Sequence, residues 1–405
     1  MKPNIQSFQK DYQIGIKCRV YPNEEQAEIF EKTFGCCRKV WNIVRNTLEC
    51  QILNWQKDSE NNPFPDTRDF TLQACVTEFR RMPEYFYLLE VSSSALRNKL
   101  TDLSVAYSGS IGKKKVFKKG RPKLKEKGHY DSYRLFAPKF RLVGDKHLKL
   151  ERIPGLVRIV LDRPLPSEAS QITISRNPAG QYFVSFLCWV TPEKTNGTGF
   201  IGLDFGLNSL LTFSNGDKTV NHRFYRRSER RSRRLRKNLS RKQKGSANFE
   251  KNRVQVAILD QRVANQRKDQ YHNLSRKIVN ENQVIVLEIL SILNMLKNRR
   301  LAKSIQDAAW GILINMLKYK ALHSGHCKIF FADRFFPSSH ICSNTGIHRG
   351  KKLELSDRSW ECPHCGEIHD RDINAAQVLR NAGIRFIQDN PGVLDAPETF
   401  VFIPL

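Results

Sequence analysis

The fold of this chain is decided by the stretch GFIGLDFGLNSLLTFSNGDKTV (199–220). It opens with an apolar strand that carries a single acid, Asp204. A second apolar run then reaches Asn215-Gly216, a pair that favours the tight turn of a β-hairpin. The stretch therefore predicts hairpin-connected strands, the first of which holds one carboxylate among apolar side chains.

Helix and strand patterns alternate after this stretch. A long basic segment with helical character comes first, and a short apolar strand (283–288) then ends in Glu288. A predicted helix (301–325) and a further strand (327–333) complete the series. Strand, hairpin, helix, strand, helix, strand is the order of a ribonuclease-H-like α/β fold.

The residues before 199 follow two other patterns. Residues 12–20 alternate between apolar and polar, which predicts a strand, and Asn23 can cap a helix that starts at Glu24. Helical periodicity then continues to about residue 111. From 129 to 198 the period returns to two, with tight turns between short runs. We expect an antiparallel sheet or barrel that includes the first strand, with the helical block as an insertion.

Net charge points to the class of partner. The 405 residues include 68 Lys and Arg against 40 Asp and Glu, a formal charge of +28. Nineteen of the basic residues lie in 221–280, and nine more lie in 113–127. A solvated helix or flexible arm is the alternative interpretation of the first run, but nucleic acid is the favoured partner, ahead of an anionic membrane surface.

Other compositional features narrow the setting. No run approaches twenty apolar residues, which argues against a membrane span, and the polar first residues lack the apolar core of a signal peptide. The ten cysteines are irregularly spaced, which argues against a disulfide scaffold. We therefore expect a protein of the cytoplasm.

Asp204 and Glu288 are the first candidate site residues. Each is the one acid in an apolar strand, where an uncompensated charge is costly. Each could instead pair with a local Lys or Arg or lie at a strand end. In the predicted sheet the two strands are parallel neighbours, so their carboxylates would repel unless a divalent cation lies between them.

A third carboxylate is expected in ECPHCGEIHDRDINAAQVLRNAG (361–383). Asp370 and Asp372 stand just before a helix, and Asp372 could be no more than its N-cap. A metal site with two acids already in place needs a third carboxylate, which weakens the interpretation of Asp372 as a cap alone.

The cysteines of this region make an incomplete zinc-ribbon pattern. Cys362 and Cys365 form a C-x-x-C pair, and Cys342 lies upstream, but Thr345 stands where a fourth cysteine would belong. The histidines that could replace it are His340, His348, His364 and His369. Because one thiolate is missing, we expect weak zinc binding or none. If zinc is held tightly, His340 or His348 is the expected replacement.

Several collinear motifs resemble the TnpB family of RNA-guided nucleases, which insertion sequences carry and which are related to type V CRISPR effectors. The resemblance covers nearly the whole chain. The motifs that carry it are GLDFG (202–206), VIVLE (284–288), MLKNRRLAKSIQDAAWG (295–311), DRFFPSSHICS (333–343) and CPHCGEIHDRDINAAQVL (362–379).

The resemblance implies a RuvC-type nuclease whose catalytic acids are Asp204, Glu288 and Asp372, holding two magnesium ions. It implies a guide RNA derived from the transposon end and a double-stranded DNA target beside a short adjacent motif. It also implies zinc at Cys342, Cys362 and Cys365, which Thr345 puts in question. The implied setting is a prokaryotic cytosol or nucleoid.

Together these observations predict a multidomain α+β protein. A ribonuclease-H-like (RuvC) nuclease domain would comprise 199–336 and 367–405, interrupted by a zinc-ribbon-like insertion at 337–366 that binds target nucleic acid. An antiparallel β-barrel (wedge-like) domain would comprise 1–21 and 112–198, with 22–111 as its helical recognition insertion. Two alternatives to the endonuclease remain: an RNA-guided repressor that binds DNA without cutting it, and a transposase that joins DNA ends.

Overall fold

The computed structural model describes residues 12–111, 120–128, 131–191, 197–348, 350, 357–396 and 399–403. The described residues divide into two compact units, one ending at Val190 and the other beginning at Thr191, which we call the N-terminal and C-terminal units. Among the described helices, none is long and apolar enough to cross a membrane.

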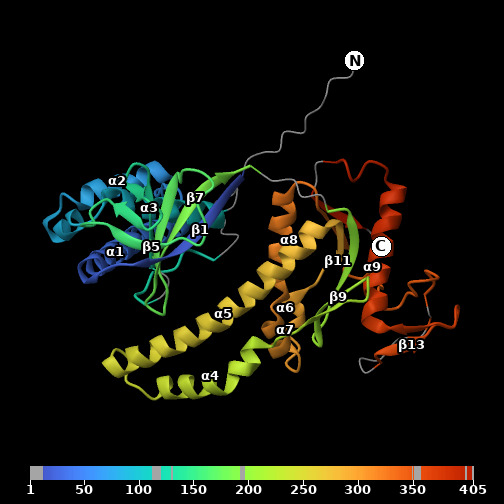
Figure 1. The fold of residues 1–405 in the computed structure, drawn as a ribbon. Coiled ribbons are helices and arrows are strands. Elements are labelled where there is room, and N and C mark those ends of the chain that lie inside the picture. The colour runs from blue at the N-terminus through green and yellow to red at the C-terminus, as the bar shows by residue number, and fades with distance from the viewer. Residues whose placement is uncertain are drawn as a thin grey trace. The chain divides into compact units, whose positions relative to one another are not determined.

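The N-terminal unit combines helices with one antiparallel sheet (Figure 1). Its strands are paired in the order β2-β6-β7-β1-β5-β4-β3, with β2 and β3 at the edges. Its helices are α1 (Glu24–Lys57), α2 (Asp69–Phe79), the 3-10 helix η1 (Pro83–Leu89) and α3 (Ser93–Ser110). Its strands are β1 (Tyr12–Tyr21), β2 (Asp131–Phe136), β3 (Phe140–Val143), β4 (His147–Leu150), β5 (Val157–Val160), β6 (Gln171–Arg176) and β7 (Tyr182–Val190).

The first strand lies in the middle of this sheet. β1 pairs along its length with β7 and, at its end, with β5, both antiparallel. The predicted pairing of residues 12–20 with the later strands is therefore confirmed. The predicted cap is also present: the Asn23 side chain accepts a hydrogen bond from Gln26 N at 2.8 Å, and the Gln26 side chain accepts one from Asn23 N at 3.2 Å. This reciprocal box starts α1 at Glu24, three residues after the last residue of the strand.

The C-terminal unit is built on a six-stranded sheet of order β10-β9-β8-β11-β12-β15. β8 is antiparallel to β9 and parallel to β11, which is parallel to β12. Its strands are β8 (Gly199–Phe205), β9 (Ser209–Phe213), β10 (Lys218–Val220), β11 (Asn282–Glu288), β12 (Lys328–Ala332) and β15 (Phe400–Ile403), with the small hairpin β13 (Ser359–Glu361) and β14 (Ile368–Asp370). Its helices are α4 (Phe224–Ser240), α5 (Ala247–Glu281), α6 (Ile292–Met295), α7 (Ala302–Ala308), α8 (Trp310–Ser324) and α9 (Arg371–Asp389).

Helices cover both faces of this sheet (Figure 1). Ile285 and Leu287 of β11 join a core with residues of α5 and α8. The alternate residues Val284 and Val286 join a second core with Leu379 of α9. The unit is therefore a three-layer α/β structure, as the order of elements predicts.

Glycine lets α9 lie directly against β8. A Cβ on Gly202 would meet the carbonyl oxygen of Ala376 at 2.0 Å, which no side chain can do. Gly383, about two turns further along α9 than Ala376, lies against the side chain of Val286 with equally little room for a Cβ. This close approach brings the first turn of α9 to the end of β8 that carries Asp204.

The predicted helix 301–325 is interrupted. It consists of α7 and α8, because Ala309 adopts a left-handed conformation with φ 45° between them. The interruption leaves α7 beside α4, where the buried carboxylate of Asp307 accepts hydrogen bonds from Tyr225 N at 2.9 Å and Arg226 N at 3.1 Å. Asp307 thus caps the N-terminus of α4 from another helix.

Candidate active site and metal cluster

Asp204 and Glu288 lie at the carboxyl ends of neighbouring parallel strands. The register pairs Leu203 of β8 with Leu287 of β11, so the next residues along, Asp204 and Glu288, are neighbours across the sheet. Because side chains alternate along a strand, Asp204 shares a face with Gly202, and Glu288 shares one with Val286. Both carboxylates therefore project on the side covered by α9.

The start of α9 separates the roles of two aspartates. Asp370 is the N-cap: its Oδ1 accepts hydrogen bonds from Asp372 N and Ile373 N, both at 3.0 Å. Its Oδ2 accepts one from Lys218 Nζ at 2.7 Å. Burial opposes ionisation, but these hydrogen bonds lower the pKa of Asp370. Asp372 lies in the first turn of α9. The N-cap role that the sequence left open for Asp372 is therefore filled by Asp370.

The three predicted acids line one cavity of about 450 Å³, which we call the carboxylate cavity. Its floor comes from β8, β11 and α9. Two arginines, Arg358 and Arg371, line the same cavity as the three acids. The other lining residues are Phe205, Gly206, Leu207, Asn208, Met295, Leu301, Ser338, Ser339 and Ala375.

The electrostatics of the cavity suit a bound cation. Burial, followed by the charges of Glu288 and Asp372, raises the pKa of Asp204 to about 7. Burial also raises the pKa of Glu288. Within the described residues neither of these two carboxylates forms a salt bridge. Acids that are gathered, desolvated and unpaired are stabilised by a divalent ion, which prefers oxygen ligands.

Arg358 and Arg371 add positive charge to the lining of the same cavity. The Arg371 charge lowers the pKa of Asp204, against the larger effects that raise it. Ser338 and Ser339 contribute hydroxyl groups. The cavity therefore offers carboxylates for a metal beside cations and hydroxyls that can contact a phosphate.

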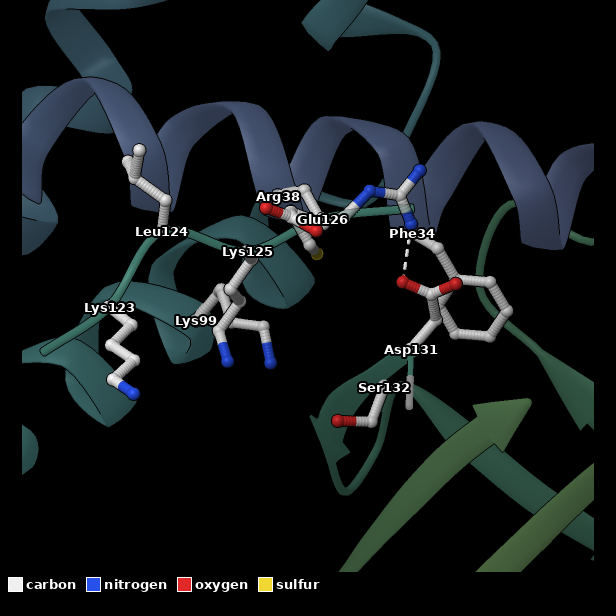
Figure 2. Close-up of a pocket in the computed structure, with 10 residues that line it drawn as sticks. Phe34, Arg38, Lys99, Lys123, Leu124, Lys125, Glu126, Asp131 and Ser132 are labelled. Carbon is white, nitrogen blue, oxygen red and sulfur yellow. Dashed lines mark hydrogen bonds and ion pairs between the residues drawn. The ribbon is translucent and has the colours of Figure 1, made fainter. Parts of the chain in front are cut away.

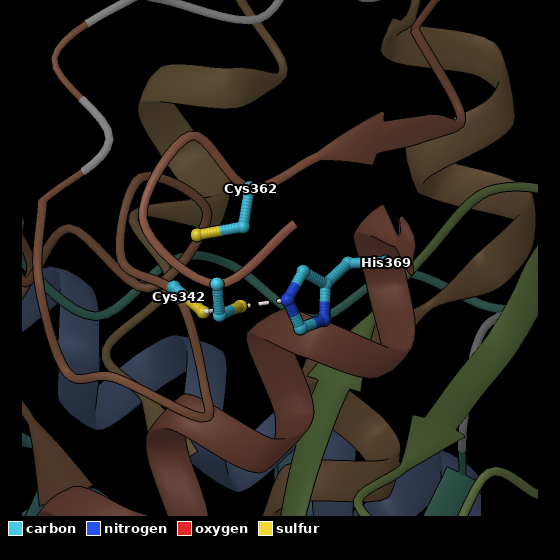
Figure 3. Close-up of side chains that lie close together, drawn as sticks. Cys342, Cys362 and His369 are labelled. Atoms are coloured by element: carbon cyan, nitrogen blue, oxygen red, sulfur yellow. Dashed lines mark hydrogen bonds between the residues drawn. The ribbon is translucent and has the colours of Figure 1, made fainter. Parts of the chain in front are cut away.

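Three cysteines and one histidine form a second cluster, which we call the Cys–His cluster. The ligand atoms of Cys342, Cys362, Cys365 and His369 all lie within 4.8 Å of one another. Cys342 Sγ is 3.3 Å from His369 Nε2 and 3.8 Å from Cys365 Sγ (Figure 3). His369 is brought there by the β13–β14 hairpin, in which it pairs with Trp360. Three thiolates and one imidazole form a set that binds structural zinc.

The expected replacement for the missing cysteine was wrong. His340 and His348 stack on each other, with ring centroids 5.5 Å apart, and are not part of the cluster. His369 supplies the fourth group instead. Thr345 has a different role: although burial opposes ionisation of Cys342, hydrogen bonds from the Thr345 side chain and backbone lower the pKa of Cys342 to about 6. A thiol that ionises near neutral pH is ready to bind a metal.

The longer basic run forms a helical hairpin, α4 and α5 (Figure 1). The two helices are held together by Asn252 Nδ2, which donates to Leu235 O at 3.0 Å, and by an ion pair between Arg236 and Asp260 at 2.7 Å. The exposed side of α4 carries arginines at 227, 230, 231 and 234. The hairpin therefore presents a dense row of positive charge.

The shorter basic run is described from residue 120 onward, and its first part, 113–119, lies outside the described residues. The described part is extended along α1. Trp41 Nε1 donates to Lys123 O at 3.1 Å, and Asn42 exchanges two hydrogen bonds with the backbone of Lys125. A cavity of about 350 Å³ lies beside it. Figure 2 shows Lys99, Lys123 and Lys125 among the side chains that line this cavity. These hydrogen bonds hold the described part of the run against α1.

Three family models match the chain. A family described as "Probable transposase" matches residues 176–299, a "Cas12f1-like, TNB domain" matches residues 310–379, and a "Helix-turn-helix domain" matches residues 12–46. Residues 12–46 of this chain form β1 and the first part of α1, a strand followed by a helix.

Similar proteins and one similar structure cover most of the chain. A "Putative RNA-guided DNA endonuclease" of Streptomyces pristinaespiralis is 37% identical over 91% of this chain and 89% of the relative. "Putative RNA-guided DNA endonuclease InsQ" of Escherichia coli is 24% identical over 91% of this chain and 92% of the relative. A solved Cas12f1–sgRNA–target DNA complex aligns with a TM-score of 0.54 at 15% identity, covering 89% of this chain and 83% of that one, a similarity of fold.

Proposed function

The chain belongs to the TnpB family, and from this membership we propose that it is an RNA-guided DNA endonuclease encoded by a transposable element. The single observation that carries the proposal is the carboxylate cavity, in which Asp204, Glu288 and Asp372 meet. The 37% identical relative named as an RNA-guided DNA endonuclease supports it. Neither the repressor nor the strand-transfer alternative is favoured by an observation of its own.

The C-terminal unit supports a RuvC-type, ribonuclease-H-like nuclease domain. The strand order β10-β9-β8-β11-β12, with β9 antiparallel to its neighbour β8, is the order expected for that class. We assign 199–336 and 367–405 to the nuclease domain. Because His369 belongs to the Cys–His cluster, we move the end of the zinc-ribbon-like insertion from 366 to 369, so that the nuclease domain resumes at Asp370. The barrel-like and helical domains, 1–21 with 112–198 and 22–111, remain our proposal for the N-terminal half.

Asp204, Glu288 and Asp372 would hold two magnesium ions against the scissile phosphate. When bound, such ions supply an activated water and neutralise the leaving oxygen. The residues of the chain position these acids: Gly202 allows α9 to approach β8, and Asp370 fixes the first turn of α9 by capping it. Arg358, which lines the cavity, would contact the phosphate.

Zinc in the Cys–His cluster would fix the insertion to the start of α9. His369 lies one residue before the cap Asp370, so a metal held by His369 and the three cysteines ties the ribbon to the helix that carries Asp372. A structural zinc contributes directly to folding. We therefore propose zinc as a structural metal, with His369 as its fourth ligand.

The basic surfaces would hold the guide RNA and its hybrid with DNA. The exposed arginines of α4 offer phosphate contacts that need no base sequence, so target choice is left to base pairing. We propose a guide RNA from the transposon end and a double-stranded target with an adjacent motif. Such a protein would work in the cytosol or nucleoid of a prokaryotic host.

The test is cleavage by purified protein that carries a matched guide RNA and magnesium. Asp204→Ala, Glu288→Ala and Asp372→Ala should each abolish cleavage and leave RNA-dependent DNA binding in place. Asp370→Ala is the matched control: it loosens the first turn of α9 but removes no carboxylate that lines the cavity, so this variant should retain substantial cleavage. Cleavage by all three active-site variants would refute the proposal.

A further inference from the structure

The zinc-ribbon-like insertion supplies part of the lining of the carboxylate cavity. Ser338 and Ser339, which precede Cys342, line the cavity, and so does Arg358, which stands just before β13. The carbonyl oxygen of Arg358 accepts a hydrogen bond from Arg371 N at 2.9 Å, next to Asp372. The position of the insertion against α9 therefore affects the shape of the cavity.

A buried asparagine of α9 holds the part of the insertion that surrounds Cys342. Asn374 is 1% exposed. Its Nδ2 donates to Ile341 O at 2.7 Å, and its Oδ1 accepts from Ser343 N at 2.9 Å. These two backbone groups lie on either side of Cys342. One side chain thus fixes the backbone before and after a member of the Cys–His cluster.

The backbone of Cys342 itself is fixed within the insertion. Its N–H donates to Ile347 O at 3.1 Å, and its carbonyl oxygen accepts from Gly346 N at 2.9 Å. This closed turn leaves Cys342 little freedom of its own. The position of its Sγ relative to α9 therefore depends on the two hydrogen bonds of Asn374.

Asp372 lies in a short segment that is tied to the Cys–His cluster at both ends. His369 belongs to the cluster and precedes Asp372 in the chain. Asn374 follows Asp372 and is tied to the cluster through the backbone on both sides of Cys342. A segment held at both ends by one rigid group has little room to move in its middle, where Asp372 faces the carboxylate cavity.

We propose that Asn374 is a positioning residue that couples the Cys–His cluster to the carboxylate cavity. Zinc in the cluster would hold Asp372 in place through Asn374 and so strengthen metal binding in the cavity. The proposal rests on the proposed function, which supplies a metal for each site. Residues that orient a metal ligand without touching the metal commonly change metal affinity by about 10- to 100-fold. Coupling between two binding sites is also reciprocal, so metal in the cavity should strengthen zinc binding.

Asn381 provides the matched control. Its Nδ2 donates to Ser343 O at 2.9 Å, so it joins the same helix to the same loop of the insertion. It lies about two turns beyond Asn374, however, and away from the segment that contains Asp372. Asn381→Ala therefore removes a comparable hydrogen bond and leaves both ends of that segment tied to the cluster.

The test measures metal binding on full-length protein freed of nucleic acid, with zinc bound or removed by a chelator. Manganese is the probe for the cavity, and electron paramagnetic resonance measures the free ion. Removing zinc should weaken manganese binding by wild type about tenfold. In Asn374→Ala the effect of zinc should fall to about threefold or less, because the link through His369 alone remains. Asn381→Ala should keep the wild-type effect.

Three results would overturn the proposal. The first is manganese binding by wild type that is absent or does not change when zinc is removed, an outcome that holds whether or not the variants fold. The second is the full effect of zinc in Asn374→Ala. The third is an equal loss of the effect in Asn381→Ala, because it would show that any hydrogen bond between helix and loop serves the same purpose.

The assay requires no cleavage, so the two proposals fail separately. A chain that never cuts guided DNA, but loses the effect of zinc in Asn374→Ala, would refute the endonuclease and retain the coupling. A chain that cuts guided DNA, but binds manganese equally with and without zinc, would refute the coupling alone.

Discussion

Replacing Asp204 with asparagine should make the metal-free protein more stable at neutral pH. The substitution keeps the size of the side chain and removes its charge. Burial and the charges of Glu288 and Asp372 raise the pKa of Asp204 from 3.8 to about 7. The folded state therefore holds this proton more tightly than the unfolded state does.

The direction of the pH effect follows from that difference. Asp204 contributes fully to the free energy of unfolding below its unfolded-state pKa. This contribution is lost as pH rises toward the folded-state pKa of about 7, and no further change is expected above that pH. Three pKa units correspond to about 4 kcal/mol. Because Asp204 is only partly buried and opens into the carboxylate cavity, water screens it, and we expect about 2–4 kcal/mol.

The measurement is thermal and urea unfolding of wild type and Asp204→Asn between pH 4.5 and 8 in EDTA. The stability advantage of the variant should grow across this range and level off above pH 7. Magnesium should then stabilise the wild type more than the variant, since the variant has lost a ligand. Asp370→Asn is the control of opposite sign. Because the pKa of Asp370 is lowered in the folded state, removing this carboxylate should destabilise the protein most at high pH. Parallel pH profiles for wild type and Asp204→Asn would refute the electrostatic account of the cavity.

Three further outcomes are expected. Gly202→Ala should displace α9, lower the free energy of unfolding by about 3 kcal/mol or more and abolish cleavage, because its Cβ would lie 2.0 Å from a backbone oxygen. The measurements are circular dichroism and cleavage, and Gly109→Ala, which has open space around its Cβ, is the control. Metal analysis should find one zinc per chain, lost in His369→Ala and retained in His340→Ala; zinc retained by the first variant would remove His369 from the site. Asp307→Ala should destabilise the C-terminal unit by about 2–4 kcal/mol in urea unfolding, because Arg267 and the first turn of α4 lose their buried acceptor; an unchanged midpoint would count against that cap.

The strands and their acids could be predicted because their signals are local. Asp204 and Glu288 each interrupt an apolar run, and the order of elements places those runs side by side. The structure brings both to one cavity with Asp372. The break at Ala309 could not be predicted, since alanine is the best helix former and nothing in the local sequence indicates the φ of 45° that it adopts.

Two choices between neighbouring residues also depended on three-dimensional geometry. Asp370 and Asp372 are both acids at a helix start, and only the backbone path shows that Asp370 is the cap. His369 was one of four candidate histidines. Its place in the cluster is set by the register of the β13–β14 hairpin, which spacing from Cys362 does not reveal.

The position of β1 has a consequence for the synthesis of the protein. This first strand is central in its sheet, yet its partners begin at Val157 and Tyr182, more than 130 residues later. At roughly 5–20 residues per second, about 10–30 s pass before β7 leaves the ribosome.

For most of that interval both edges of β1 lack their native partners, because β5 is made only shortly before β7. The helices α1 to α3, whose contacts are local, can form in the meantime, but the sheet cannot close until the last of its strands is made. The N-terminal unit should therefore fold late and cooperatively, and a ribosome that stalls before residue 190 would leave an open strand edge exposed to aggregation.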